Sequence, residues 1–193
     1  MRCTIYFDGA CEPVNPGGLG TYGFVIYGEN GKRVARGYGV ACSGSSCTNN
    51  VAEYTALREA LKRALELGCS QVVVKGDSQL VVKQIRGEWG VNSSRLLALR
   101  DEVEELLGKF DSWEIQWVPR EENREADGLS QIAYELHAAE YGYGKGDQTQ
   151  ELLSQLKRSA EAEGLTLDEA ASVLTALLRR YKISDLRALV EGD

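Results

Sequence analysis

The sequence predicts an α/β fold, in which a mixed sheet with helices packed on it is followed by a small all-helical region. Two observations predict this fold. Residues 3–41 contain three strand-like runs separated by turn signals, which is typical of antiparallel strands. From residue 50 onward, runs with helical spacing of apolar residues alternate with short apolar strands. The 193 residues, of which 43% are hydrophobic, suffice for one ordinary domain and a small appendage.

Three strands open the chain. Residues 3–7 predict a buried strand that ends at Asp8-Gly9. A second strand covers residues 22–27, and the Asn30-Gly31 pair marks a hairpin turn into a third strand over residues 34–41. Because short hairpins join antiparallel strands, we expect these strands to be antiparallel.

Helices and strands alternate in the middle of the chain. Leu57, Leu61 and Leu65 recur every four residues, which predicts a helix from about Asn50 that stops at Gly68. The remaining predicted elements are a buried strand over 71–75, a short helix through Arg86, a helix over 96–106, a strand over 113–118 and a helix over 123–140.

The composition changes near residue 140. Residues 141–149 are rich in glycine and polar residues, which is typical of a linker, so we assign the main domain to residues 1–140. Residues 150–193 predict a small helical domain. A bundle of this size is marginal on its own, so we expect its helices to contact the substrate, the main domain or another chain.

Composition also excludes some classes of protein. No run approaches the roughly 18 to 20 apolar residues that span a bilayer, and the N-terminus does not resemble a signal peptide. We therefore expect a cytoplasmic protein with no membrane partner. Five cysteines without a CxxC pair, beside a single histidine, disfavour a zinc site. Cys42 and Cys47 flank a short turn that would allow a disulfide, but reduced thiols are expected in the cytosol.

Four acidic residues lie at the ends of predicted elements. Asp8 and Asp77 each follow a buried strand, so their carboxylates emerge side by side if the two strands are parallel neighbours. Glu53 and Asp127 fall in the first turns of two predicted helices. Clustered carboxylates repel each other unless a cation lies between them, and hard oxygen ligands suit Mg²⁺ or Mn²⁺. The alternative for each acid alone is a local role in a turn or at a helix N-terminus.

Five short motifs surround these acids. In chain order they are Asp8-Gly9-Ala10-Cys11, Asn15-Pro16-Gly17-Gly18, Thr48-Asn49-Asn50 with Ala52-Glu53-Tyr54, Gly76-Asp77-Ser78-Gln79-Leu80-Val81, and Trp117-Val118-Pro119-Arg120-Glu121 through Ala126-Asp127. Together they resemble the ribonuclease HI family of the ribonuclease H-like superfamily, especially its archaeal-like and short bacterial branches. The resemblance covers residues 1 to about 140 and leaves the C-terminal region unexplained.

The resemblance implies a five-stranded mixed sheet and endonucleolytic hydrolysis of the RNA strand of RNA:DNA hybrids, with double-stranded RNA as a further substrate. It implies that Asp8, Glu53, Asp77 and Asp127 are catalytic and hold two Mg²⁺ ions, for which Mn²⁺ can substitute. One ion can generate hydroxide from water while the other stabilises the leaving oxygen, which gives 5′-phosphate and 3′-hydroxyl ends.

Further residues are implied at the substrate. Asn15, Asn49 and Gln79 would contact the nucleic acid near the cut, together with the backbone of Cys11. Thr48 and Asn15 match the family pocket that grips a DNA phosphate. The alternative role for Asn49 or Asn50 is to cap the following helix.

The roles of two regions, Trp89 and the segment before Asp127, have more than one candidate. The family's mobile loop histidine has no counterpart in the segment before Asp127, so Arg120, Glu121 or Glu122 is expected to take its role. Trp89 would stack in the DNA-binding channel or occupy a satellite core position.

Two other functions stay open at this stage. A 3′ to 5′ exonuclease of the same superfamily also uses four acids, but the Asp-Gly-Ala-Cys and Asn-Pro-Gly-Gly motifs disfavour it. A non-catalytic hybrid-binding module has no use for mutually repelling carboxylates. The net charge of −7 disfavours a nucleic-acid partner at first inspection. Because four acids are expected metal ligands, we instead expect binding that depends strongly on metal.

Overall fold

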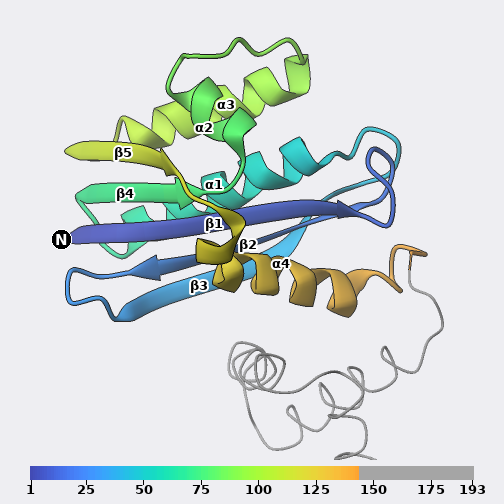
Figure 1. The fold of residues 1–193 in the computed structure, drawn as a ribbon, viewed down its shortest axis with the longest axis horizontal. Helices are drawn as coiled ribbons and strands as arrows, with labels where there is room; N and C mark the ends of the chain where they lie inside the picture. The colour runs from blue at the N-terminus through green and yellow to red at the C-terminus, as the bar shows by residue number, and fades with distance from the viewer. Residues whose placement is uncertain (144–193) are drawn as a thin grey trace, which may run out of the picture. The chain divides into compact units, whose positions relative to one another are not determined.

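The structure is a computed structural model that describes residues 1–143, drawn in Figure 1. Its elements are β1 (Arg2–Glu12), β2 (Leu19–Tyr27), β3 (Arg33–Ser43), α1 (Asn49–Glu66), β4 (Gln71–Gly76), α2 (Gln79–Ile85), α3 (Ser94–Leu107), β5 (Ser112–Trp117), the 3₁₀ turn η1 (Arg120–Glu122) and α4 (Arg124–His137). All the elements predicted before residue 140 are present. The predicted helical domain at 150–193, its contacts and most of the linker at 141–149 lie outside the described residues.

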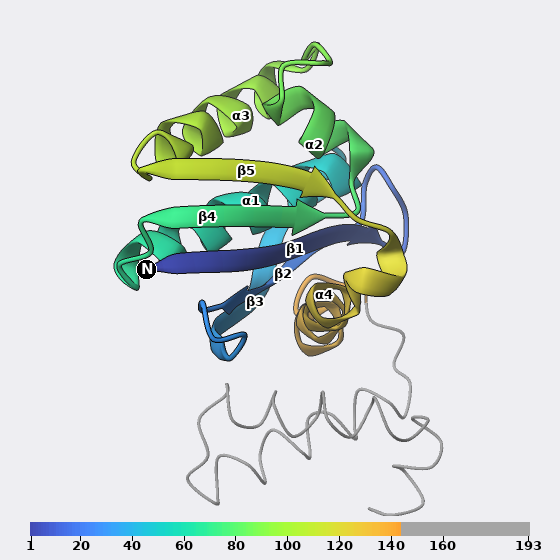
Figure 2. The same ribbon diagram turned by 60° about the vertical axis from the view of Figure 1, so that its left-hand side comes forward.

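The five strands form one mixed sheet in the order β3-β2-β1-β4-β5. β1, β2 and β3 are antiparallel, as their hairpin signals predicted, whereas β4 pairs in parallel with β1 and β5 in parallel with β4. Figure 2 shows α1, α2 and α3 on one face of the sheet and α4 on the other. Within residues 1–143, no helix is both long enough and apolar enough to cross a membrane.

The helix α1 packs closely on the sheet. Thr48 precedes it, and the Thr48 side chain accepts a hydrogen bond from the backbone N–H of Val51, which makes Thr48 the N-cap. The expectation that Asn49 or Asn50 caps this helix is therefore wrong. One face of α1 carries small, fully buried residues at every fourth position, namely Ala52, Ala56, Ala60 and Ala64. Small side chains on one face allow a helix backbone to approach its neighbours closely.

The strand β1 is longer than the sequence predicted. The expected strand over residues 3–7 continues to Glu12 instead of ending at Asp8. Parallel pairing with β4 stops where Phe7 meets Gly76, but antiparallel pairing with β2 continues as far as Glu12 and Leu19. Asp8 therefore lies inside a strand, at the point where one of its two neighbouring strands has ended.

Four of the five cysteines form disulfide bonds, Cys3–Cys69 and Cys42–Cys47, and Cys11 is free and buried. The expectation of reduced thiols is thus contradicted. The parallel pairing of β1 with β4 brings Cys3 and Cys69 to a Cα–Cα distance of 6.0 Å. The turn after β3 brings Cys42 and Cys47 to 5.3 Å. Both distances lie in the range that a disulfide spans.

Candidate metal and nucleic-acid site

Asp8 and Asp77 lie beside each other where β4 ends. Phe7 pairs with Gly76 in the parallel register, and an aspartate directly follows each of these residues. Because the strands run in the same direction, both carboxyl groups emerge at the same edge. Asp8 is buried, with 7% of its surface exposed. A buried carboxyl group next to a second carboxyl group calls for an explanation beyond turn formation.

Two glycines allow α1 and α4 to approach Asp8 from opposite faces of the sheet. A Cβ atom on Gly9 would lie 2.3 Å from the backbone carbon of Ala52 and 2.4 Å from the backbone nitrogen of Glu53. A Cβ atom on Gly23, which pairs with Asp8 across the strands, would lie 2.4 Å from the carbonyl oxygen of Ala126. No side chain fits at either position, so α1 delivers Glu53 and α4 delivers the residue after Ala126, which is Asp127, close to Asp8.

The carboxyl groups change each other's acidity. Burial, followed by the charges of Asp77, Asp127 and Glu53, raises the pKa of Asp8 to about 9. Burial also raises the pKa of Glu53 to about 7, against the opposing effect of a hydrogen bond from Ser78. At neutral pH without metal, a proton on Asp8 therefore relieves the repulsion that a cation would otherwise relieve.

Three of the acids have separate hydrogen-bond or ion-pair partners. Ser78 donates to Glu53 at 2.7 Å. The side-chain amide of Asn123 donates to Asp77 at 3.1 Å, and the guanidinium of Arg120 pairs with Asp127 at 3.3 Å. No three His, Cys, Asp or Glu side chains of residues 1–143 converge closely enough to hold a metal ion in this arrangement. Asp8 has no separate donor of this kind and instead shares a side-chain hydrogen bond with Asp127.

The donor set nevertheless fits a hard divalent cation. All four groups are carboxylates, and they come from β1, α1, the end of β4 and α4. The pKa of about 9 at Asp8 shows that this position disfavours an uncompensated negative charge. Oxygen ligands of this kind suit Mg²⁺ or Mn²⁺, whose charge would offset that of the carboxylates.

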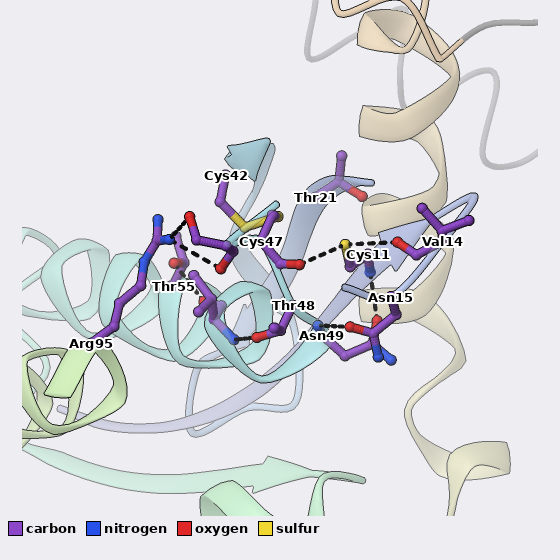
Figure 3. The surroundings of a disulfide bond; sticks show 12 residues. Cys11, Val14, Asn15, Thr21, Cys42, Cys47, Thr48, Asn49, Thr55 and Arg95 are labelled. Atoms are coloured by element: carbon purple, nitrogen blue, oxygen red, sulfur yellow. Dashed lines mark hydrogen bonds between the residues drawn. A yellow bond between two sulfur atoms is a disulfide. The ribbon is translucent and has the colours of Figure 1, made fainter. Parts of the chain in front are cut away.

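A second cluster joins the residues expected at the substrate. The backbone N–H of Cys11 donates to the side-chain oxygen of Asn49 at 2.6 Å, and the backbone N–H of Asn49 donates to the side-chain oxygen of Asn15 at 3.1 Å. Figure 3 shows these contacts next to Thr48 and the Cys42–Cys47 disulfide. The structure thus brings Cys11, Asn15, Thr48 and Asn49 together at the N-terminus of α1.

The two other expected substrate residues lie at or beyond the end of β4. Gln79 is exposed and begins α2, directly after the N-cap Ser78. Trp89 is 45% exposed, and the Lys83 ammonium lies 4.5 Å from its ring centroid, which is within the range of a cation–π interaction. This exposure favours a surface role for Trp89 over a core position.

The segment in place of the loop histidine forms the 3₁₀ turn η1. Its three residues are Arg120, Glu121 and Glu122, and both glutamates are exposed. Arg120 contacts Asp127, and the Asp127 charge raises the pKa of the guanidinium above its ordinary value. A guanidinium is always protonated in proteins and cannot relay a proton.

Sequence reasoning missed Asn123 and Ser78, which orient two of the acids. Ser78 was visible as the residue after Asp77, and in the structure it is the N-cap of α2. Asn123 was visible as the residue that precedes α4. Its contact with Asp77 follows from the fold and has no signal in the sequence spacing.

A mixed sheet in this order with helices on both faces (Figure 2) defines the ribonuclease H-like class of fold. The chain belongs to the reverse transcriptase-like family, whose model matches residues 6–133. Among curated relatives, ribonuclease HI of Halobacterium salinarum is 42% identical over 132 residues, a match that covers 68% of this chain and 64% of the relative. The bifunctional protein Rv2228c of Mycobacterium tuberculosis is 36% identical over 138 residues, which cover 72% of this chain and 37% of that protein. The chain therefore spans less than two thirds of either relative.

Solved structures agree with the fold. The crystal structure of RNase H1 from Halobacterium salinarum matches with a TM-score of 0.65 and 39% identity, over 70% of this chain and 98% of that one. The crystal structure of LC11-RNase H1 in complex with an RNA/DNA hybrid matches with a TM-score of 0.62 and 30% identity, over 68% of this chain and 95% of that one. The expectation of a five-stranded ribonuclease H-like sheet is confirmed.

Proposed function

We propose that the chain is a metal-dependent endoribonuclease that hydrolyses the RNA strand of RNA:DNA hybrids and leaves 5′-phosphate and 3′-hydroxyl ends. The observation that carries this proposal is the set of carboxylates that four separate elements deliver around the buried Asp8. Similarity to LC11-RNase H1, which was crystallised with an RNA/DNA hybrid, supports this class of substrate. Double-stranded RNA is a further substrate under the same proposal.

Asp8, Glu53, Asp77 and Asp127 would hold two Mg²⁺ ions, with Mn²⁺ as a substitute. When bound, the ions would supply an activated water and stabilise the charge that develops on the phosphate and the leaving oxygen. The chain itself brings the four carboxylates to the same edge of the sheet and buries that of Asp8. Ser78 additionally holds Glu53 by a hydrogen bond that favours the ionised form.

The N-terminus of α1 would bind the nucleic acid. The side-chain oxygens of Asn15 and Asn49 each accept a backbone N–H, so the amide groups are fixed and their amino groups are available to ribose hydroxyls or phosphate oxygens. The Thr48 hydroxyl accepts from Val51 and keeps its own proton for donation. The partial positive charge at a helix N-terminus adds attraction for a phosphate.

Arg120 would take the place of the family's loop histidine, with a different task. Its guanidinium pairs with Asp127 and stays charged, so it would attract the scissile phosphate and the product 5′-phosphate without transferring a proton. Glu121 and Glu122 stay as weaker candidates, because their carboxylates would repel a phosphate. This assignment predicts that Arg120 affects turnover more than it affects folding.

A cleavage assay on end-labelled RNA:DNA hybrids in Mg²⁺ or Mn²⁺ tests the proposal, with double-stranded RNA and DNA as parallel substrates. Internal cuts confined to RNA, absent in Asp8→Asn, are the expected result. A ladder that grows from one end would instead indicate a 3′ to 5′ exonuclease. Retarded but intact hybrid would indicate a binding module without turnover. Full activity of Asp8→Asn would refute the proposed metal site.

A further inference from the structure

Asn123 is a buried amide between the acids of the candidate site. Its exposed fraction is 1%. The side-chain nitrogen donates to the backbone carbonyl of Phe7 at 2.8 Å and to the carboxylate of Asp77 at 3.1 Å. Phe7 directly precedes Asp8 in β1. One amino group therefore bridges the two adjacent strands at the point where both aspartates emerge.

The backbone of Asn123 reaches a third acid. Its carbonyl oxygen accepts the N–H of Asp127 at 3.1 Å, and its own N–H donates to the carbonyl of Arg120 at 3.0 Å. These main-chain bonds place Asn123 at the start of α4, which carries Asp127. Its side chain and main chain together touch the immediate surroundings of Asp8, Asp77 and Asp127.

The side-chain oxygen of Asn123 indicates that the amino group, and not the oxygen, makes the contacts of this side chain. Its side-chain oxygen is buried and makes no hydrogen bond within residues 1–143. Turning the amide over would place this oxygen against two acceptors, the Phe7 carbonyl and the Asp77 carboxylate, so the observed orientation is fixed by chemistry. An orphaned buried oxygen is unfavourable, so the favourable contacts of this side chain are the two that its amino group makes.

We propose that Asn123 is a positioning residue for the carboxylates of the metal site. From the start of α4, its amino group holds Asp77 against β1, so that Asp8, Asp77 and Asp127 are arranged before a cation arrives. Asparagine suits this task because its amino group offers two donors and carries no charge that would compete with the cation. The inference rests on the proposed function, since it assumes that these carboxylates bind a divalent cation.

Replacing Asn123 with alanine in the full chain tests the proposal. Partners that orient metal ligands typically change metal affinity or activity by about 10- to 100-fold when they are removed. We expect the Mg²⁺ concentration at half-saturation, measured by NMR titration without nucleic acid, to rise by at least about tenfold. The kcat on the hybrid should fall by a similar factor while KM changes less than about twofold. Asn123→Ser, which keeps one donor, should lose less Mg²⁺ affinity and less activity than Asn123→Ala. It also covers the case in which the alanine variant does not fold.

Thr21→Val provides a matched control. Thr21 is buried, and its hydroxyl donates to the carbonyl of Ser130 at 2.9 Å, so this change also removes a buried hydrogen bond between the sheet and α4. We expect a comparable loss of thermal stability with unchanged Mg²⁺ affinity. The proposal would be overturned if Asn123→Ala bound Mg²⁺ as tightly as wild type, or if Thr21→Val lost as much Mg²⁺ affinity as Asn123→Ala. It would also be overturned if wild type bound no Mg²⁺. If wild type binds Mg²⁺ but cleaves no hybrid, the proposed function fails while the titration still decides the role of Asn123.

Discussion

Replacing Asp8 with asparagine should make the metal-free protein progressively more stable than wild type as the pH rises, although the variant should be inactive. The carboxyl group of Asp8 is buried among three other acids, and its pKa is raised from 3.8 to about 9. Between these two values the folded protein keeps a proton that the unfolded chain has released. Asparagine has a similar shape and no proton to lose, so this contribution is absent from the variant.

The sign and size follow from proton linkage. When the folded state binds more protons than the unfolded state, the free energy of unfolding falls as the pH rises, by about 1.4 kcal/mol per pH unit for one group. Between pH 6 and pH 8, which lies inside the window set by 3.8 and about 9, wild type should therefore lose about 3 kcal/mol relative to Asp8→Asn. Glu53 is present in both proteins and does not create this difference.

Urea denaturation in EDTA at about pH 6, 7 and 8 measures the effect, with disulfides left intact. Asp101→Asn is the matched control, because it makes the same chemical change at a carboxyl group that is 59% exposed. The gap between wild type and the control should not vary with pH over this range. A gap between wild type and Asp8→Asn that stays constant from pH 6 to 8 would refute the reasoning, since Asp8 would then titrate alike in both states.

Other predictions address the metal, the packing and the loop. Mg²⁺ should stabilise wild type and not Asp8→Asn. Mg²⁺ binding to wild type should tighten as the pH rises toward about 9, because a proton must leave Asp8. Calorimetry in buffers of different ionisation enthalpy should detect the release of that proton. Gly9→Ala should lower the free energy of unfolding in chemical denaturation by at least about 1 to 3 kcal/mol and should reduce cleavage, since its Cβ would lie 2.3 Å from the backbone of Ala52. Gly90→Ala, with open space around it, should neither lower that free energy nor reduce cleavage. Arg120→Ala should lower kcat by about tenfold or more and leave the melting temperature nearly unchanged, because the Arg120 side chain is 75% exposed; an equally active variant would contradict its assigned role.

The sequence was sufficient to predict the order of the elements, because that order depends on local patterns. Hydrophobic spacing located the helices, and short apolar runs located the strands. Pairing between distant segments was the part that local patterns could not supply. The extension of β1 to Glu12 depends on β2, which lies alongside it. The Cys3–Cys69 bond joins residues 66 positions apart that become neighbours only when β4 docks on β1.

The same limit explains why Asn123 was not predicted. Its side chain bonds to a main-chain carbonyl on β1 and to an acid at the end of β4, and neither partner is near it in the sequence. Residues that hold a site through main-chain atoms leave no pattern of complementary side chains. The four acids, by contrast, were assigned because the motifs around them resemble those of ribonuclease HI.

The two positions without a side chain, Gly9 and Gly23, also provide a criterion for deciding which related sequences are active. Each helix that supplies an acid rests directly on strand backbone at one of these positions. A homologue could keep all four acids and still fail to assemble them if either glycine were replaced by a residue with a side chain. Inspecting the two glycines together with the four acids should therefore separate active homologues from degenerate copies better than the acids alone.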